Sequence, residues 1–319
     1  MNPKKLEGLE ITISKHRTIV PVYIPNTEGY YKDAFDLLKL CLTTLFQTIS
    51  KNSVVTVINN NCNEEVSEYL YDLFKAGKIE QLILNTTNKG KIEAVLDAFR
   101  NSKENLITIT DADVLFKQDW LLETKKVFNT FPRVGFVSPL PLPDGCNYYS
   151  KWSWFYGFLN GKIVREEHAD IESLNLFKKS ILIEKELSDI EKTPFKLKKN
   201  GITAVIGAGH FCATYNKNII SEIPYEFSGN KFGVGEALFF DKPIEDAGFL
   251  RLATDKGWVF HMGANTEEWM LDVVNENVKK EVKDIKVEIS NKGYSPNFIF
   301  SLLMKARFKK IRYKLVKKV

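Results

Sequence analysis

The chain has 319 residues and a formal net charge of +5, and 44% of its residues are apolar. This length suits one large α/β domain with an extension, or two small domains. Four scattered cysteines without a CxxC pair argue against a disulfide framework or a zinc ribbon, and they are typical of a reducing cytoplasm. The first 15 residues hold no hydrophobic signal segment, and no apolar run approaches the length of a membrane span. We therefore expect a cytoplasmic globular protein.

Two hydrophobic periods alternate along the first half of the chain. Short β-branched runs predict strands, and apolar residues three and four apart predict helices. We expect strands at 17–24, 53–58, 79–84 and 106–110, and helices at 33–50, 64–76 and 91–101. This alternation predicts an α/β fold with a parallel, doubly wound sheet and right-handed crossovers.

The second half is less regular. We expect helices at 120–131, 245–256 and 268–289, and strands at 135–139, within 202–215 and at 258–261. Residues 160–200 are strongly charged and are interpreted as an insertion. The aromatic residues at 152–156 have the spacing of a buried helix face, although their rings would also suit stacking on a sugar. We divide the chain into a main domain, 1–265, and a helical extension, 266–319.

Asp111 and Asp113 follow the fourth predicted strand directly. In open α/β sheets this end of a strand is where ligands bind. Two carboxylates placed so close repel each other unless a cation joins them, and oxygen ligands suit Mg²⁺ or Mn²⁺, which usually bring a substrate phosphate. The alternative is a surface loop with two solvated aspartates, or an N-cap for the next helix.

Residues 305–319 combine eight lysines and arginines with apolar residues at helical spacing and contain no acid. Such a basic amphipathic helix can lie on an anionic membrane surface, which would make the protein peripheral to the membrane. It can equally pack on the domain with a solvated basic face. Nucleic-acid binding is not expected, because no zinc-finger or RNP signature accompanies the charge.

The order of elements from Arg17 to Gly263 resembles the family 2 inverting glycosyltransferases of the GT-A fold. Residues 19–26 resemble the opening strand of that family, which ends at a proline, and 88–91 resemble its Asn-x-Gly segment. Asp111-Ala112-Asp113 matches the family's metal motif, and Glu245-Asp246 resembles its Glu-Asp motif. The resemblance implies a Rossmann-like, mostly parallel sheet flanked by helices, with a helical C-terminal extension.

The resemblance also implies a site. It places Mn²⁺ or Mg²⁺ on Asp111, Asp113 and His261, and makes Asp246 the base that activates the acceptor hydroxyl, with Glu245 beside it. A buried histidine at a strand end is the alternative for His261. The residues expected to contact the nucleotide-sugar donor are Pro25, Asn26, Asn59, Asn88, Lys91, Asp111, Ala112 and His210.

Asn59 departs from the family pattern, which has an aspartate at this position to read the base. An amide oxygen can still accept a hydrogen bond from uracil, while the amide nitrogen can also donate one. We therefore expect a UDP-sugar donor, with other bases open.

These features predict a metal-dependent inverting transfer of a hexosyl or N-acetylhexosaminyl group. The expected acceptor is a hydroxyl of a glycan or lipid-linked glycan, in bacterial surface polysaccharide synthesis. One alternative is a sugar nucleotidyltransferase, but the loop at 25–29 lacks the Gly-rich, basic sequence which that class would carry after its first strand. A phosphatase would carry its Asp-x-Asp motif after the first strand. The remaining alternative is a non-catalytic, carbohydrate-binding or nucleotide-sugar-binding relative.

Overall fold

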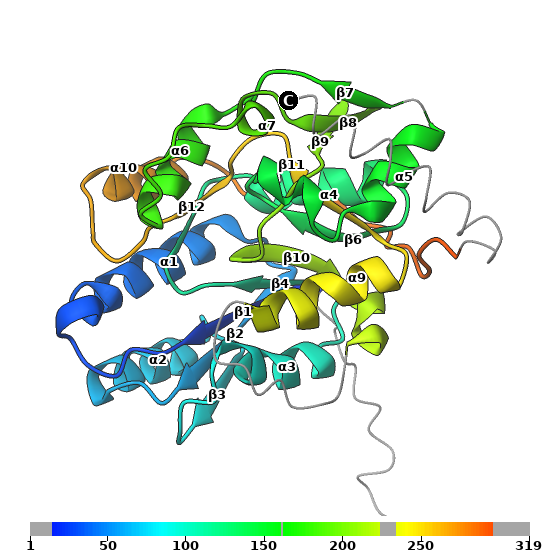
Figure 1. Cartoon of the computed structure of the whole chain (residues 1–319). Helices are drawn as coiled ribbons and strands as arrows, with labels where there is room; N and C mark the ends of the chain where they lie inside the picture. The colour runs from blue at the N-terminus through cyan, green and yellow to red at the C-terminus, as the bar shows by residue number, and fades with distance from the viewer. Residues whose placement is uncertain (1–14, 161, 224–233, 296–319) are drawn as a thin grey trace, which may run out of the picture.

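A ten-stranded sheet forms the centre of the structure, and helices cover both of its faces (Figure 1). The structure is a computed structural model and describes residues 15–160, 162–223 and 234–295. The strand order is β3-β2-β1-β4-β10-β6-β11-β9-β8-β7. The strands are β1 (His16–Val22), β2 (Ser53–Asn60), β3 (Gln81–Asn85), β4 (Leu106–Thr110), β6 (Val134–Ser138), β7 (Ile163–Arg165), β8 (Phe195–Lys199), β9 (Ile202–Val205), β10 (Cys212–Asn216) and β11 (Leu250–Thr254).

The sheet is mostly parallel, as the alternation in the sequence predicts. β3, β2, β1 and β4 are parallel neighbours, and β11 is parallel to β6. β10 is antiparallel to both β4 and β6 and lies between them. β5 (Val114–Phe116) and β12 (Val259–His261) form a separate antiparallel pair beside the end of β4. The carboxyl ends of the parallel strands therefore meet the start of β10 and this small ribbon at one edge.

Helices on the two faces bury alternate residues of the strands. On β1, Val20 and Val22 belong to the core cluster beneath α1, whereas Ile19 belongs to the cluster beneath α3. Successive side chains of a strand point to opposite faces, so one apolar run serves both cores. The helices are α1 (Ala34–Thr48), α2 (Glu64–Lys75), α3 (Lys91–Asn101), α4 (Trp120–Thr130), α5 (Lys151–Leu159), α6 (Ile171–Ser180), α7 (Asp189–Lys192), α8 (Val234–Glu236), α9 (Lys242–Asp246) and α10 (Trp269–Val278).

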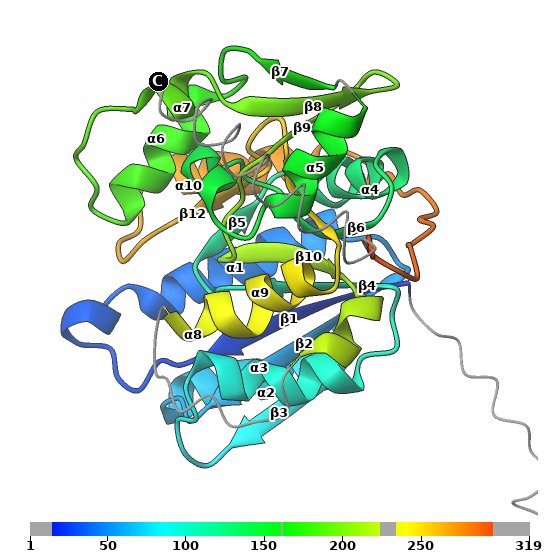
Figure 2. The same ribbon diagram turned by 45° about the vertical axis from the view of Figure 1, so that its right-hand side comes forward.

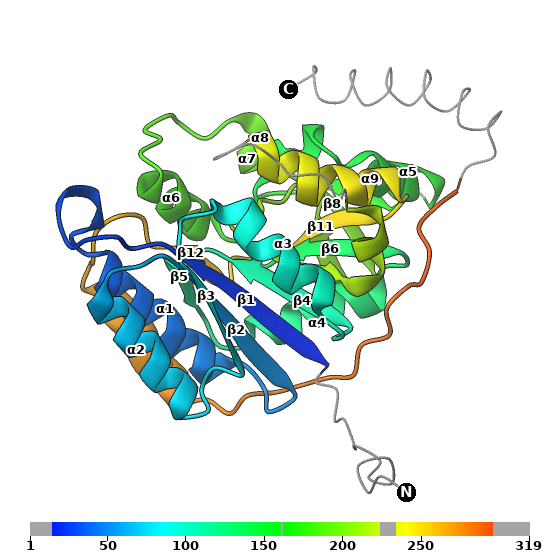
Figure 3. The ribbon, with the colours of Figure 1, turned by 90° about the horizontal axis from the view of Figure 1, so that it is seen from below.

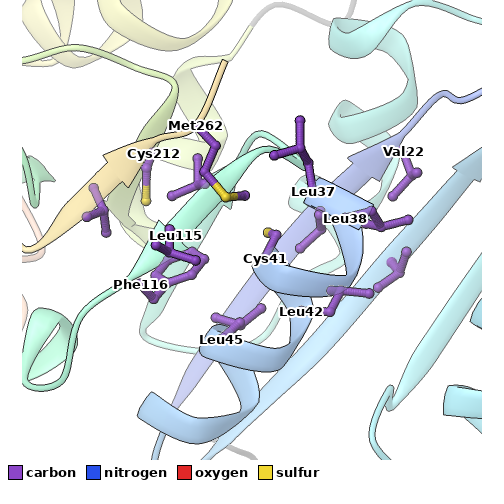
Figure 4. Packing of buried hydrophobic residues seen from close by; sticks show 14 of the residues in the cluster. Val22, Leu37, Leu38, Cys41, Leu42, Leu45, Leu115, Phe116, Cys212 and Met262 are labelled. Atoms are coloured by element: carbon purple, nitrogen blue, oxygen red, sulfur yellow. The ribbon is translucent and has the colours of Figure 1, made fainter. Parts of the chain in front are cut away.

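The core under α1 joins the sheet to the small β5–β12 ribbon (Figure 4). Leu38 and Leu42 of α1 are fully buried in the same cluster as Leu115 of β5, and Met262 follows β12 directly. Burying such side chains stabilises the fold by about 1.5–3 kcal/mol each. The ribbon is therefore fixed to the rest of the domain by apolar packing close to its polar end.

The helix predicted at 245–256 is wrong. α9 ends at Asp246, and the chain returns as β11, whose five residues are all buried. Gly248 has φ +83°, a conformation that ends helices, and the backbone of Tyr294 fills the space that a side chain there would need. Because β11 is enclosed by β6 and β9, packing outweighs the helical spacing of its sequence.

The predicted helix at 268–289 is shorter than expected, because α10 ends at Val278. The following residues run extended past the start of the strands, where Asp284 pairs with Lys125 and Ser290 accepts from Asn216 (Figure 3). No helix in the described part of the chain is long and apolar enough to cross a membrane. The basic segment 305–319 lies outside the described residues, and the boundary at 265 stays a prediction.

Three other segments can be compared with their predictions. The charged segment 160–200 contains β7 and β8, which extend the sheet, in addition to α6 and α7. Within 202–215 the single strand and turn are two strands, β9 and β10. The rings of Trp152, Trp154 and Tyr156 are buried in a hydrophobic core, which confirms the structural interpretation of the aromatic run.

His16 is a fully buried histidine at the start of β1. Its ring contacts the hydroxyls of Ser53, at 3.1 Å, and Thr108, at 2.8 Å. Burial and, to a lesser degree, the charge of Lys125 together lower its pKa to about 3. The ring is therefore neutral in the folded protein.

We predict that His16 makes the fold sensitive to mild acid. The unfolded chain takes up this proton near pH 6.5 and the folded chain only near pH 3, so stability is full above about pH 6.5 and falls as the pH drops towards 3, by about 1.4 kcal/mol per pH unit. Urea unfolding from pH 7 to pH 4.5 should show a smaller pH slope for His16→Asn than for the wild type. Equal slopes would contradict this account.

Candidate functional site

Asp111, Asp113 and His261 lie together where β4 ends beside the β5–β12 ribbon. His261 is paired across the ribbon with Val114, and the backbone N–H of Met262 donates to the carbonyl oxygen of Asp113 at 2.8 Å. One ligand atom from each of the three residues lies within 4.8 Å of the others. The structure thus brings together all three residues that the sequence predicts as metal ligands.

The electrostatics of this cluster suit a divalent cation. Burial raises the pKa of Asp113; the neighbouring His261 opposes this rise, and the charge of Asp111 adds to it. Two partly buried carboxylates at this separation need a positive charge. Carboxylate oxygens and an imidazole nitrogen form a donor set that Mn²⁺ accepts. The residues present therefore fit the metal that the resemblance implies.

Lys91 carries the nearest positive charge. It is the first residue of α3, directly after Gly90, whose φ of +77° turns the chain into the helix. Its ammonium pairs with the carboxylate of Asp111 and, at 2.5 Å, with that of Glu236. Burial alone would lower the pKa of Lys91, but the two carboxylates outweigh it and raise the pKa. Lys91 therefore joins the aspartate pair to an acid from α8.

Glu236 also contacts a second charged group, formed by His210 and its partner Asp241. Its Oε2 lies 2.9 Å from Nε2 of His210, and Nδ1 of His210 lies 3.3 Å from Oδ2 of Asp241. Burial would lower the pKa of His210, but its hydrogen bonds to the two carboxylates raise it to about 9. Burial would likewise raise the pKa of Glu236, but His210 and Lys91 lower it to about 2. The imidazole is a cation and Glu236 an anion at neutral pH.

Asp241 is buried and is held by Arg251 of β11. The Oδ1 atom of Asp241 lies 3.3 Å from Nε of Arg251, whose guanidinium also donates to the carbonyl oxygen of Ala208 at 2.5 Å. The carbonyl oxygen of Phe211, next to His210, accepts from the backbone N–H of Asp111 at 2.8 Å. The antiparallel strand β10 therefore brings His210 to the carboxyl end of β4.

A π-helical turn explains how Glu236 and Asp241 reach the same histidine. The turn, η5 (Ala237–Asp241), joins α8 to α9 on the face of the sheet that α3 also covers (Figure 2). In an α-helix, residues five apart point about 140° away from each other. A π-turn instead places residues i and i+5 one above the other, and such turns are frequent at functional sites.

Glu245 and Asp246 lie at the opposite end of this helix. Ten residues separate Asp246 from Glu236, which is about 15 Å along a helix axis. The carboxylate of Asp246 is 57% exposed and pairs with Lys242, and that of Glu245 accepts from the backbone N–H of Lys151 at 3.0 Å. The contacts found for Asp246, the predicted general base, and for its neighbour Glu245 are therefore not with the aspartate cluster.

Asn59, predicted to read the base, and Asn88, predicted to contact the donor, both make hydrogen bonds within the protein. Asn59 is buried, accepts from the backbone N–H of Cys62 at 2.8 Å and donates to Ser67 at 2.9 Å. Asn88 accepts from Asn60 at 2.8 Å. These contacts hold the loops that follow β2 and β3, and the roles of Asn59 and Asn88 in donor binding stay a prediction.

Two further donor-site residues lie at the end of β1. Asn26 is exposed and lines a cavity of about 600 Å³ between this end and the start of α2, whereas Pro25 is half-buried. Ala112 packs against the core between the two aspartates. The sequence did not reveal the contacts of Glu236 and Asp241, because a spacing of five residues matches no regular helix face. Arg251 was missed because β11 was predicted as part of a helix.

Comparison with known proteins identifies the family. The model for glycosyl transferase family 2 matches residues 28–213, more than half of the chain, so the chain belongs to this family. Its α/β sheet has the GT-A fold, and its membership supports a nucleotide-sugar glycosyltransferase. The matched range includes Lys91, Asp111 and His210 but not Glu236 or His261. A search of curated proteins finds no match to the sequence.

Several solved structures resemble this one at low identity. A mannosyltransferase from Pyrobaculum calidifontis, in complex with GDP-Man and Mn²⁺, is 16% identical over 70% of this chain, with a TM-score of 0.39; the chain spans 51% of that protein. GalNAc-T7 with UDP, GalNAc and Mn²⁺ is 14% identical over 79% of this chain and 43% of its own, with a TM-score of 0.44. The inositol-1-phosphate CTP transferase from T. maritima is 12% identical over 85% of this chain and 99% of its own, with a TM-score of 0.45.

We predict that His210 stabilises the fold in a pH-dependent way. Its pKa is raised in the folded state, so its contribution is full below about pH 6.5 and is lost as the pH rises through about 9. In urea unfolding, His210→Gln should be less stable than the wild type at pH 6 and approach it at pH 9.5. A difference that does not change with pH would contradict the charged network.

Proposed function

We propose that the protein transfers a sugar from a nucleotide-sugar donor to a hydroxyl of a glycan or lipid-linked glycan, with the help of Mn²⁺ or Mg²⁺ and with inversion. The observation that supports this most is the continuous charged site in which Lys91 connects Asp111 to Glu236. One side of it suits a leaving diphosphate, and the other offers a carboxylate for the acceptor. In a bacterial cell such a reaction would serve surface polysaccharide synthesis.

The leaving-group side consists of the aspartate cluster and Lys91. Breaking the bond between sugar and phosphate builds negative charge on the diphosphate, and a bound divalent ion supplies a Lewis acid that offsets this charge. Asp111, Asp113 and His261 would hold the ion. Lys91, at the start of α3, presents an ammonium where a diphosphate would arrive, at the helix N-terminus, where the helix dipole favours an anion.

The acceptor side requires a base, and we propose Glu236 for this role. An inverting transfer removes a proton from the acceptor hydroxyl as its oxygen attacks the anomeric carbon. Glu236 is ionised and is in contact with Lys91, whereas His210 is already protonated and cannot take the proton. A diphosphate that attracts Lys91 would remove one of the cations that hold the pKa of Glu236 low, and so strengthen it as a base.

We predict that Mn²⁺ and a nucleotide sugar together stabilise the protein and that the sugar is slowly hydrolysed. A panel of UDP- and GDP-sugars, screened with Mn²⁺ by thermal shift, should identify the donor, and product analysis should show hydrolysis rather than nucleotidyl transfer. Asp113→Ala should lose the Mn²⁺-dependent shift and at least 100-fold in rate. No stabilisation by any nucleotide sugar in the panel would refute the proposed function.

We predict that Glu236 and Asp246 differ in their effect on transfer. Glu236→Gln, which removes the basic oxygen but little volume, should lower kcat by 10²–10⁴-fold, the range for loss of a general base. Asp246→Asn is the matched control and should change kcat by less than about 3-fold, because its carboxylate is exposed and pairs with Lys242. The reverse pattern would return the base to Asp246, as the sequence predicts.

A further inference from the structure

Ser180, the last residue of α6, connects the inserted segment to the proposed metal site. Its Oγ lies 3.0 Å from Nδ1 of His261 and donates to the carbonyl oxygen of Phe177 at 2.7 Å. A serine hydroxyl has one hydrogen to donate and two lone pairs to accept with. We assign that hydrogen to the carbonyl oxygen of Phe177, which is the shorter contact and can only accept, so Ser180 accepts from the histidine.

This hydrogen-bond direction determines which nitrogen of a neutral His261 carries the hydrogen. Nδ1 must carry it, since Nδ1 is the donor to Ser180. Nε2 then presents a bare lone pair, and it faces Oδ2 of Asp113 at 3.6 Å. That separation exceeds a normal hydrogen bond, so no hydrogen bond joins the two atoms and a cation could bind both. The ring is thus arranged as a ligand before any ion arrives.

Close packing holds Ser180 in this position. Gly263, two residues after the histidine, has φ +76°, and a side chain there would come within 2.8 Å of the carbonyl oxygen of Ser180. The rings of Phe177 and Phe211 meet His261 edge to face, with centroids 5.9 and 5.4 Å away. The imidazole can therefore neither turn freely nor move away from the hydroxyl.

We propose that Ser180 is a positioning residue that fixes the hydrogen of His261 on Nδ1 and thereby keeps Nε2 available to a divalent cation. This inference rests on the metal site of the proposed function. Without the hydroxyl, His261 can move its hydrogen to Nε2 and donate it to Asp113, which blocks two ligands at once. Partners of this kind typically change metal affinity by 10–100-fold.

The experiment measures Mn²⁺ binding to the full chain without nucleotide, by calorimetry or by the electron paramagnetic resonance of free Mn²⁺. Ser180→Ala should bind Mn²⁺ about ten-fold more weakly than the wild type, and Ser180→Thr, which keeps the hydroxyl, should restore binding. Lys179→Ala is the matched control on the same helix end, because Lys179 is exposed and pairs with Glu267, and it should bind as the wild type does.

A spectroscopic measurement separates positioning from a loss of structure. The chain has four histidines, so ¹⁵N-labelled imidazole resonances can be assigned with a His261→Gln variant. In the metal-free protein the wild type should show the Nδ1–H form of His261, and Ser180→Ala should shift it towards Nε2–H. An unchanged ring form with unchanged Mn²⁺ affinity in Ser180→Ala would overturn the inference about Ser180 while leaving the metal site intact. A wild type that binds no Mn²⁺, or binds it as well after Asp113→Ala, would instead overturn the metal site and this inference together.

Discussion

The ammonium of Lys91 is the contact on which the site depends. A buried charge is costly unless it is paired, and here one cation satisfies two carboxylates from distant parts of the chain. Asp111 directly follows the end of β4, and Glu236 is the last residue of the short helix α8, 125 residues further along the chain. Their shared partner keeps the two halves of the site together in the free protein. A substrate phosphate would compete for this cation, so donor binding and the state of Glu236 would be linked through one side chain.

The sheet topology explains why so many charged residues meet at one place. The parallel strands bring Asp111 to their common edge, and the antiparallel strand β10 starts at that same edge, which places His210 beside it. The β5–β12 ribbon adds His261 from a segment 150 residues further along the chain than Asp111. Each group arrives on a strand end or a helix start whose backbone is fixed by apolar packing. The positions of the charged side chains are therefore set by the apolar core that fixes the backbone beneath them.

Much of this arrangement could be predicted from the sequence, and the parts that could not have physical reasons. The strands and helices up to α4 have clear periods, and Asp111 and Asp113 follow a strand whose hydrophobic pattern is unambiguous. β11 was predicted as part of a helix, because Leu250 and Leu252 reveal their strand only through burial between two neighbours. Glu245 and Asp246 were predicted as site residues by their resemblance to a motif. Glu236 was not among the predicted site residues, because helix periodicity does not connect it to Asp241. Ser180 could not be found at all, since its importance depends on where its single hydrogen goes.

Because of the π-helical turn at Ala237–Asp241, the contacts of His210 depend on the five-residue spacing between Glu236 and Asp241. Removing one residue from the turn would shorten it towards a regular α-helix. The segment before it would then rotate by about 100° about the helix axis. Glu236 would leave Lys91, and His210 would keep only one of its two carboxylates. The number of residues between Glu236 and Asp241 therefore sets whether both acids can contact His210 at the same time.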